Sequence, residues 1–415
     1  PIEAICDADS LMKGGALVDG AIVHRYEEVR SITVRARRVS VTFHLYVGLI
    51  VGAVLVIAGL TGSLIVFWQP IDAALNPELL APDGACTESA SRSVDELVAA
   101  VRAKLPPGGH LSSVDLPDHE RPLLWAWYRI PAPQAGWDDT YTLFVRPCSG
   151  AVTGPRLWNS QQRPWGGPLM SALIQLHTSL WLNEGSLLLG HHLLSFGSVL
   201  LMGAILAGYY LWWPSQSRWT SAFTINRGAR GRRLHYDLHK VVGATAGGLL
   251  LLSLFTAIHM YEPWTQVIDS GVNLLSPVAD LDAPPSMSDP LAGGASISTG
   301  MALEIAMAKL PGARPVSIEF PSDEHGVYLV TLDTDAVWKT QISIEQYSGA
   351  VLRVQGPHAA SAGDHVLGWL FPLHTGQAFG LPGRILMVVL GLVPACLYVT
   401  GCVLWWKRRR TSATG

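Results

Sequence analysis

Four long apolar runs place the strongest constraint on how this chain can fold. They cover about residues 44–68, 191–213, 241–262 and 384–406, and each is long enough for the roughly 20 helical residues that cross a bilayer core. Only 15% of the residues are charged, compared with about 25% in an ordinary soluble domain. We therefore expect an α-helical membrane protein with four transmembrane helices.

Positive charges predict which side of the membrane each connection faces. Arg35, Arg37 and Arg38 precede the first apolar run, five arginines lie between residues 218 and 233, and a Lys-Arg-Arg-Arg run at 407–410 follows the last. Because such clusters stay in the cytoplasm, both termini are expected there. The two long polar stretches between spans are then expected on the opposite side.

Several motifs occur once in each half of the chain, which predicts an internal repeat. We expect each copy to contain a membrane helix, an external domain and a second membrane helix. The matches are His44 with His239, Gly48 with Gly243, Thr61 with Thr256, Gly62 with Ala257, Ser-Gly-Ala-Val at 149–152 and 348–351, Leu-His-Thr at 176–178 and 373–375, and Leu-Trp-Trp at 211–213 and 404–406.

Each external stretch is expected to form a small α+β module, in which one helix covers a short antiparallel sheet. The first module is predicted to have a helix at 94–105, N-capped by Ser93, strands at about 123–130 and 140–147, and a turn at 149–150. In the second module we expect a helix at 299–310 and strands at about 314–320, 326–333 and 338–345.

These features divide the chain into successive segments. In chain order they are a cytoplasmic N-terminal segment (1–42), the first span (43–68), the first external module (69–175), an external helix with the second span (176–213), a cytoplasmic loop (214–238), the third span (239–262), the second external module (263–368), an external helix with the fourth span (369–406) and a cytoplasmic tail (407–415).

The motifs resemble those of a known family. A helix followed by strands and Ser-Gly-Ala-Val is similar to a PepSY domain, and His-x-x-x-Gly, Leu-His-Thr and Leu-Trp-Trp resemble the PepSY-associated transmembrane family over nearly all of 40–410. That family includes ferric-siderophore reductases of bacterial inner membranes, which hold two b-type haems between histidine pairs. The resemblance thus implies an inner-membrane protein with periplasmic modules and two haem b groups; composition and periodicity alone do not establish haem.

One histidine pair is expected near the cytoplasmic face. His44 and His239 occupy matching positions in the two copies, so a pseudo-twofold axis would place them opposite each other. Gly48 and Gly243 lie on the same helical faces four residues later and would leave room for a flat macrocycle. In the alternative interpretation, each histidine only caps its span. His235 is expected to be a basic interfacial residue.

The second pair has more candidates than positions. His177 and His374 match between the copies, but each precedes its span. The short loop between the second and third spans favours His191 or His192 facing His259, and His177 with His374 is the alternative pair. His239 and His259 are 20 residues apart, ~30 Å along a helix, so two metal centres could be stacked across the bilayer.

The cysteines and tryptophans leave two questions open. Cys86 and Cys148 fall in one external module, where a disulfide is possible but not decided by sequence. Several tryptophans are expected as module core and interfacial anchors, or as a platform above the outer haem. They are Trp125, Trp127, Trp137, Trp158 and Trp165.

No nucleotide-binding or zinc-binding motif occurs, so electrons would have to come from a quinol or a cytoplasmic reductase. We expect a haem-containing oxidoreductase that reduces a ferric siderophore or another iron chelate outside the membrane. The alternative is a haem-free module that binds a periplasmic ligand or protease. Membrane lipids are expected partners, and nucleic acid is not.

Overall fold

The computed structural model describes residues 20–413, except 83, 85, 87–89, 119, 132–137, 161, 162, 164, 183–187, 227, 280–285, 291–293, 358 and 359. The chain divides into two compact units, which are described separately. The helical unit comprises Pro1–Leu55, Val199–Leu251 and Val393–Gly415, and the sheet unit comprises Val56–Ser198 and Leu252–Leu392. Residues 1–19 of the expected N-terminal segment lie outside the described residues.

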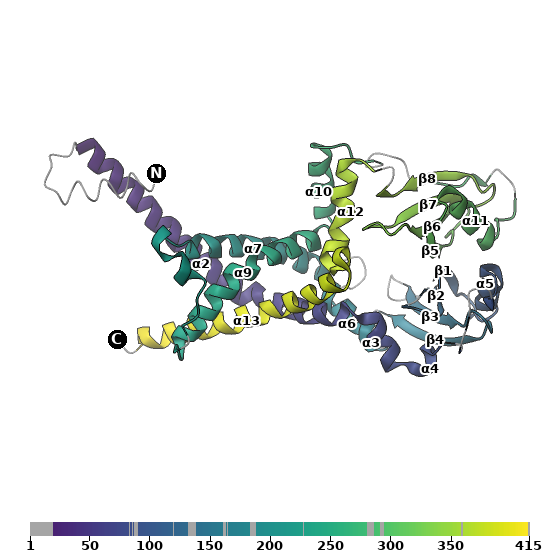
Figure 1. Cartoon of the computed structure of the whole chain (residues 1–415), viewed down its shortest axis with the longest axis horizontal. Coiled ribbons are helices and arrows are strands. Elements are labelled where there is room, and N and C mark those ends of the chain that lie inside the picture. The colour runs from purple at the N-terminus through teal and green to yellow at the C-terminus, as the bar shows by residue number, and fades with distance from the viewer. Residues whose placement is uncertain are drawn as a thin grey trace. The chain divides into compact units, whose positions relative to one another are not determined.

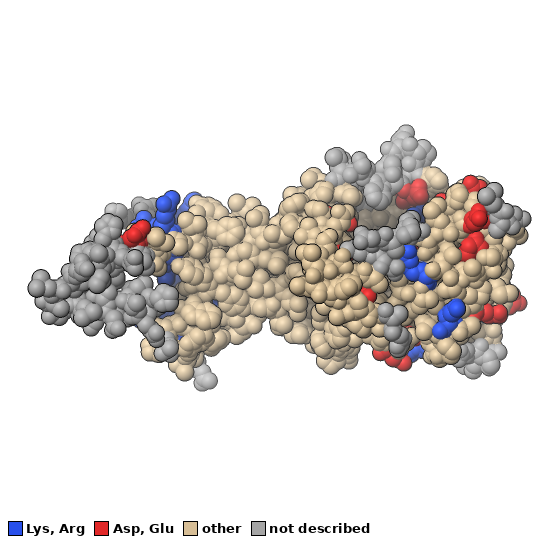
Figure 2. Space-filling view, turned by 90° about the horizontal axis from the view of Figure 1, so that it is seen from above, with Lys and Arg blue, Asp and Glu red and all other residues tan. Residues whose placement is uncertain are grey.

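Four long helices confirm the expected membrane spans. They are α2 (Gly20–Ile65), α7 (Leu189–Trp212), α9 (Arg232–Ile258) and α13 (Gly380–Ala413), and each contains an apolar stretch long enough to cross a bilayer. Figure 2 shows that the face in view is almost free of charged side chains along these helices. A helix suits this setting because it satisfies every backbone polar group internally.

The first long helix starts earlier than the sequence indicated. Within the described residues α2 is continuous from Gly20, so the expected boundary at residue 43 falls inside a helix. Shorter helical segments connect the remaining elements. They are α3 (Trp68–Leu75), α4 (Pro77–Leu80), α6 (Leu169–Ser179), η3 (Gln216–Arg218), α8 (Trp219–Ala222), α10 (Trp264–Asn273), α12 (Ala362–Thr375) and η6 (Gln377–Phe379).

A single antiparallel sheet of eight strands forms the centre of the sheet unit (Figure 1). Its order is β4-β3-β2-β1-β5-β6-β7-β8, so β1 and β5 join the two modules by direct pairing, with Val114 opposite Ile318. The strands are β1 (His110–Asp115), β2 (Leu124–Ile130), β3 (Asp139–Val145), β4 (Val152–Asn159), β5 (Arg314–Glu319), β6 (Val327–Asp333), β7 (Thr340–Glu345) and β8 (Val351–Gln355).

The strand predictions were correct for five strands and missed three. The sequence indicated β2, β3, β5, β6 and β7 but not β1, β4 or β8. The missed strands have weak patterns, because β1 contains two serines, β4 contains Gly154-Pro155, and β8 is only five residues long. Ser149-Gly150 lies between β3 and β4, as expected, and Gly150 adopts a φ of 71°, which glycine tolerates.

Two helices cover one face of the sheet, α5 (Val94–Arg102) and α11 (Thr299–Lys309) (Figure 1). Ser93 is the N-cap of α5, as predicted, and forms a capping box with Glu96. Leu97, Val98 and Val101 of α5 share a buried core with strands of both modules. The two modules therefore form one hydrophobic core.

A tryptophan-rich cluster packs on the first module. Trp125, Phe144 and Leu123 are buried there, with Trp68 of α3 packed against them. This arrangement confirms a core role for Trp125, and Trp127 and Trp158 pack against the same cluster. Trp165 is 69% exposed, and Trp137 lies outside the described residues.

The structure contains the disulfide that the sequence left undecided. Cys86 and Cys148 are bonded and close a loop of 62 residues. The loss of chain entropy in the unfolded state would give a stabilisation of about 4 kcal/mol for a loop of this length. The bond ties the segment after α4 to the turn between β3 and β4.

Arg156 and Asp72 form a buried ion pair that fixes α3 to the sheet. The guanidinium nitrogens lie 2.8 and 3.2 Å from the two carboxylate oxygens, and the side chains are only 10% and 1% exposed. The guanidinium also stacks over Phe144 and Trp158. Removal of one partner would leave the other charge buried and unpaired.

We predict that Asp72→Ala destabilises the sheet unit by about 3–5 kcal/mol, the usual cost of breaking a buried pair. Thermal unfolding of the full chain in detergent, followed by tryptophan fluorescence, would measure this loss. Asp335→Ala is the control, because Asp335 is 84% exposed in its pair with Arg314 and should contribute at most about 1 kcal/mol. Equal effects of the two substitutions would contradict the prediction.

Candidate functional site

His44 and His239 face each other in the helical unit. Their ring centroids lie 6.1 Å apart, and the ring planes are nearly perpendicular, at 89°. His44 lies on α2 and His239 on α9, and both line a cavity of about 1290 Å³. The structure thus brings together the two histidines that the sequence paired.

The hydrogen bonds of both rings determine which nitrogen carries the proton. His44 Nδ1 lies 2.7 Å from the carbonyl oxygen of Ala204, and His239 Nδ1 lies 3.1 Å from that of Leu397. Because a carbonyl can only accept, Nδ1 must donate, and the Nε2 atom of each neutral ring carries a lone pair. Metal-binding histidines commonly have this arrangement.

Glycines shape the surroundings of this pair in two ways. A Cβ on Gly48 would have no atom within 4 Å, and one on Gly243 would meet only Leu397 at 3.8 Å. Both glycines line the cavity, so they leave open space as the sequence predicted. A Cβ on Gly208 would instead lie 2.9 Å from Cε1 of His44, so Gly208 allows the ring to approach α7. The sequence analysis missed Gly208.

Basic and aromatic side chains line the same cavity. They include Arg37, Arg218, Arg232, Arg233, Lys240, Arg408, Trp212 and Trp405. Trp212 Nε1 is buried and has no hydrogen-bond partner within the described part of the chain. These groups could bind the carboxylates of an anionic ligand. His235 is not in this lining, and its Nδ1 bonds to the carbonyl oxygen of Gly231.

A buried carboxylate organises the loop beside the cavity. Asp237 is fully buried and lies 3.1 Å from Arg233 Nε and 3.6 Å from Lys240 Nζ. The backbone N–H of Asn226 donates to Oδ2 of Asp237, the same oxygen that Arg233 contacts. Lys240 also donates to the carbonyl oxygen of Ser221. These contacts hold residues 221–226 against the start of α9.

His177 and His374 form a second pair in the sheet unit. Their ring centroids lie 6.2 Å apart at an interplanar angle of 48°. His177 is in the last turn of α6, which ends where Leu180 adopts a left-handed conformation. His374 is in the last turn of α12, which ends at Gly376 with a φ of 77°. Both helix ends therefore place a histidine just before a change of chain direction.

The second pair has the same pattern of hydrogen bonds as the first. His177 Nδ1 lies 2.9 Å from the carbonyl oxygen of Ala58, and His374 Nδ1 lies 3.2 Å from that of Ser253. Burial lowers the pKa of His177. Burial and the neighbouring His177 lower the pKa of His374 to about 4. Both rings are therefore neutral near pH 7, with Nε2 available.

The other candidate histidines have different neighbours. His259 Nε2 lies 2.8 Å from Asp269, and the ring of His191 lies 5.1 Å from that of Tyr261. His192 is exposed and lies beside Phe196. Among the described ring contacts, none joins His259 to His191 or His192. Of the outer alternatives, the geometry therefore favours the pair formed by His177 and His374.

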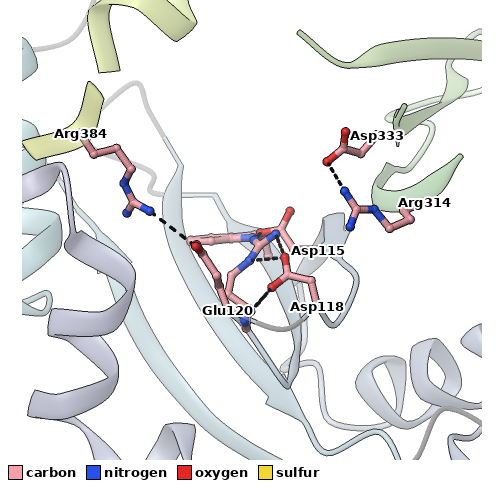
Figure 3. Close-up of polar contacts among 8 residues, drawn as sticks. Asp115, Asp118, Glu120, Arg314, Asp333 and Arg384 are labelled. Carbon is pink, nitrogen blue, oxygen red and sulfur yellow. Dashed lines mark hydrogen bonds and ion pairs between the residues drawn. The ribbon is translucent and has the colours of Figure 1, made fainter. Parts of the chain in front are cut away.

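A polar cluster on the sheet unit was not anticipated from the sequence (Figure 3). Arg384, in the first turn of α13, donates to the carbonyl oxygen of Val66 at 2.9 Å and lies 3.5 Å from Glu120. Arg121 pairs with Asp115 and Asp118. The cluster links the ends of two long helices to the connection between β1 and β2.

No group of three or more His, Cys, Asp and Glu side chains suited to a metal ion occurs among the described residues. The arrangement instead offers two sites with two imidazoles each. Such a pair suits a metal whose other ligands come from a cofactor.

The comparisons with known proteins agree with the motifs. No curated protein matches the chain significantly. The model of the PepSY-associated TM region matches residues 41–408, which includes all four histidines of the two pairs. The chain belongs to the PepSY-associated TM region family.

Proposed function

We propose that this protein is a di-haem membrane oxidoreductase that passes electrons to a ferric chelate. The observation that supports it most is the pair of matched two-histidine sites, each with an Nδ1–H bonded to a helix carbonyl. Each site would hold one haem b, with His44 and His239 as ligands of one iron and His177 and His374 as ligands of the other.

The spacing of the rings fits bis-imidazole ligation. A metal–imidazole bond is about 2 Å long, and the ring centre lies about 1 Å beyond the nitrogen. Two imidazoles that both bound one metal through Nε2 would therefore have centroids up to roughly 6 Å apart. The observed separations are 6.1 Å and 6.2 Å. Interfacial histidines with separate roles would have no reason to share this distance.

The helical unit also has the space and charge that a haem needs. The cavity around His44 and His239 has a volume of about 1290 Å³, somewhat above the usual ~300–1,000 Å³ of a ligand pocket. Gly48 and Gly243 line the cavity without adding a side chain at their positions. Arg37, Arg232 and other basic residues of the lining would pair with the propionate groups.

When bound, the haem iron would supply one-electron chemistry. The four paired histidines would hold the iron atoms, and the apolar helices around them would exclude water. One electron from a quinol or a cytoplasmic reductase would convert Fe(III) of the chelate to Fe(II). Oxygen donors of a siderophore hold Fe(II) less tightly, so reduction would favour release of iron.

The proposed orientation places the eight-stranded sheet in the periplasm of a bacterium and both termini in the cytoplasm. Arginines precede the apolar part of α2 and follow that of α13, which predicts cytoplasmic ends. The disulfide between Cys86 and Cys148 requires an oxidising compartment for the sheet unit. A duplicated helix–module–helix architecture would explain why each half supplies one histidine to each pair.

We predict that the purified protein binds two low-spin haems and that loss of any paired histidine removes one. His44→Ala and His239→Ala should each lose one site, and His177→Ala and His374→Ala the other. Haem counts per chain and reduced-minus-oxidised spectra would measure this. His259→Ala and His192→Ala are controls that should retain both haems, because neither ring belongs to a pair.

The control variants also distinguish the outer alternatives. If His259→Ala loses a haem and His177→Ala does not, the assignment of the outer pair is wrong. A colourless wild-type protein, expressed with ample iron and haem precursor, would overturn the redox function. It would instead support a haem-free binding module.

We further predict that Gly208→Ala weakens haem binding at the inner site by about 10-fold, the lower range for changes to groups that orient a metal ligand. The new Cβ would lie 2.9 Å from Cε1 of His44 and force the ring to move. Gly248→Ala is a matched control, since its Cβ would meet only the Tyr209 hydroxyl at 3.8 Å. The rate of haem transfer to an apoprotein scavenger would measure haem binding in both variants. Indistinguishable transfer rates for the two variants would rule out a role for Gly208.

A further inference from the structure

Each paired histidine rests on a recurring arrangement of a neighbouring helix. The ring bonds to the backbone carbonyl of residue i of that helix, and residue i+4 of the same helix is glycine or alanine. We call this arrangement a histidine seat. The four seats, as carbonyl residue and small residue, are Ala58 with Gly62, Ser253 with Ala257, Leu397 with Gly401, and Ala204 with Gly208.

Three of the four seats carry a buried threonine at position i+3. The hydroxyl oxygen of Thr61 lies 3.3 Å from His177 Nδ1, that of Thr256 lies 3.2 Å from His374 Nδ1, and that of Thr400 lies 3.0 Å from His239 Nδ1. All three side chains are at most 5% exposed. A hydroxyl in apolar surroundings needs a partner to offset its burial.

The direction of these hydrogen bonds follows from the hydroxyl proton. Each hydroxyl also lies within hydrogen-bond distance of the carbonyl four residues earlier on its own helix, that of Ile57, Leu252 or Cys396. Threonine commonly donates to such a carbonyl. The hydroxyl oxygen is then free to accept, so the Nδ1–H of the histidine is shared between the carbonyl and the threonine.

The seat of His44 lacks this hydroxyl. Its carbonyl comes from Ala204 and its small residue is Gly208, so position i+3 is Ala207. The other ligand of that site, His239, has Thr400. The inner pair is therefore asymmetric, and the outer pair has a threonine on both sides.

We propose that Thr61, Thr256 and Thr400 are positioning residues that set the reduction potentials of the two iron sites, and that Ala207 leaves the inner site one hydroxyl short. The inference rests on the proposed function. A second acceptor for the Nδ1–H fixes the rotation of the ring and makes the imidazole a more basic ligand. A more basic axial ligand stabilises Fe(III) relative to Fe(II), which lowers the potential.

The threonines that directly follow His177 and His374 in sequence have different hydrogen-bond partners. Thr178 follows His177, but its hydroxyl donates to Ile174 of its own helix at 2.9 Å. Thr375 follows His374 and likewise donates to Phe371. The Leu-His-Thr motif therefore does not contain the hydroxyl that contacts its histidine. That hydroxyl comes from the end of α2 or α9.

The test is a redox titration of the purified, full-length protein with both haems bound. Thr400→Val keeps the shape of the side chain and removes the hydroxyl, so the potential of the inner site should become more positive. Ala207→Thr adds the missing hydroxyl, so the same potential should become more negative. The outer site should not change in either variant. Opposite shifts at one site are not expected from a general loss of stability.

Two further variants control for indirect effects. Thr400→Ser retains a hydroxyl and should restore the wild-type potential. Thr245→Val removes a hydroxyl from α9 that donates only along its own helix, to Val241 and Val242, and should leave both potentials unchanged. Haem counts would show that each variant retains two groups.

The possible failures are distinguishable. Two bound haems with unchanged potentials in both Thr400→Val and Ala207→Thr would overturn the role of the seats and leave the di-haem function intact. Shifts of the same sign in both variants would also overturn it. A wild-type protein without haem would overturn the proposed function, and the inference with it.

Discussion

The hydrogen bond from Nδ1 of each paired histidine to a carbonyl of another helix is the interaction on which both candidate sites depend. A helical carbonyl already accepts an N–H bond within its own helix, and its second lone pair remains available. The four bonds connect α2 with α7, α6 with α2, α9 with α13, and α12 with α9. The same contact thus joins two helices and selects the tautomer that leaves the lone pair on Nε2.

The sequence predicted which histidines pair better than it predicted how each ring is held. His44 and His239 could be paired because they match between the two halves and lie on predicted spans. The seats could not be recognised, because each joins residues more than 110 positions apart. Thr61-Gly62 and Thr256-Ala257 matched between the two halves of the sequence, but nothing in their local pattern indicated that each contacts a histidine.

The outer pair shows a different limit of sequence reasoning. His177 and His374 lie on short helices rather than on the spans, so helical periodicity could not place their rings. His259 was the favoured candidate, because the short loop between the second and third spans was expected to bring it near His191 or His192. The structure gives it a carboxylate partner, Asp269. A neighbouring acid ten residues away on another helix cannot be inferred from apolar periodicity.

The sheet was also only partly predictable, and its continuity matters for the outer pair. Strands β1, β4 and β8 have no strong alternation, yet β1 pairs with β5 to join the two modules, and β4 and β8 form the edges. Pairing supplies the backbone hydrogen bonds that these short, polar segments need. Their strand conformation is therefore a consequence of the neighbouring strands rather than of their own side chains.

The two sites differ in which elements carry their histidines. His44 and His239 lie within the long helices α2 and α9. His177 and His374 lie on α6 and α12, which follow the edge strands β4 and β8 after short connections, from Asn159 to Leu169 and from Gln355 to Ala362. His177 and His374 are thus attached through these connections to the two edge strands of one folded sheet.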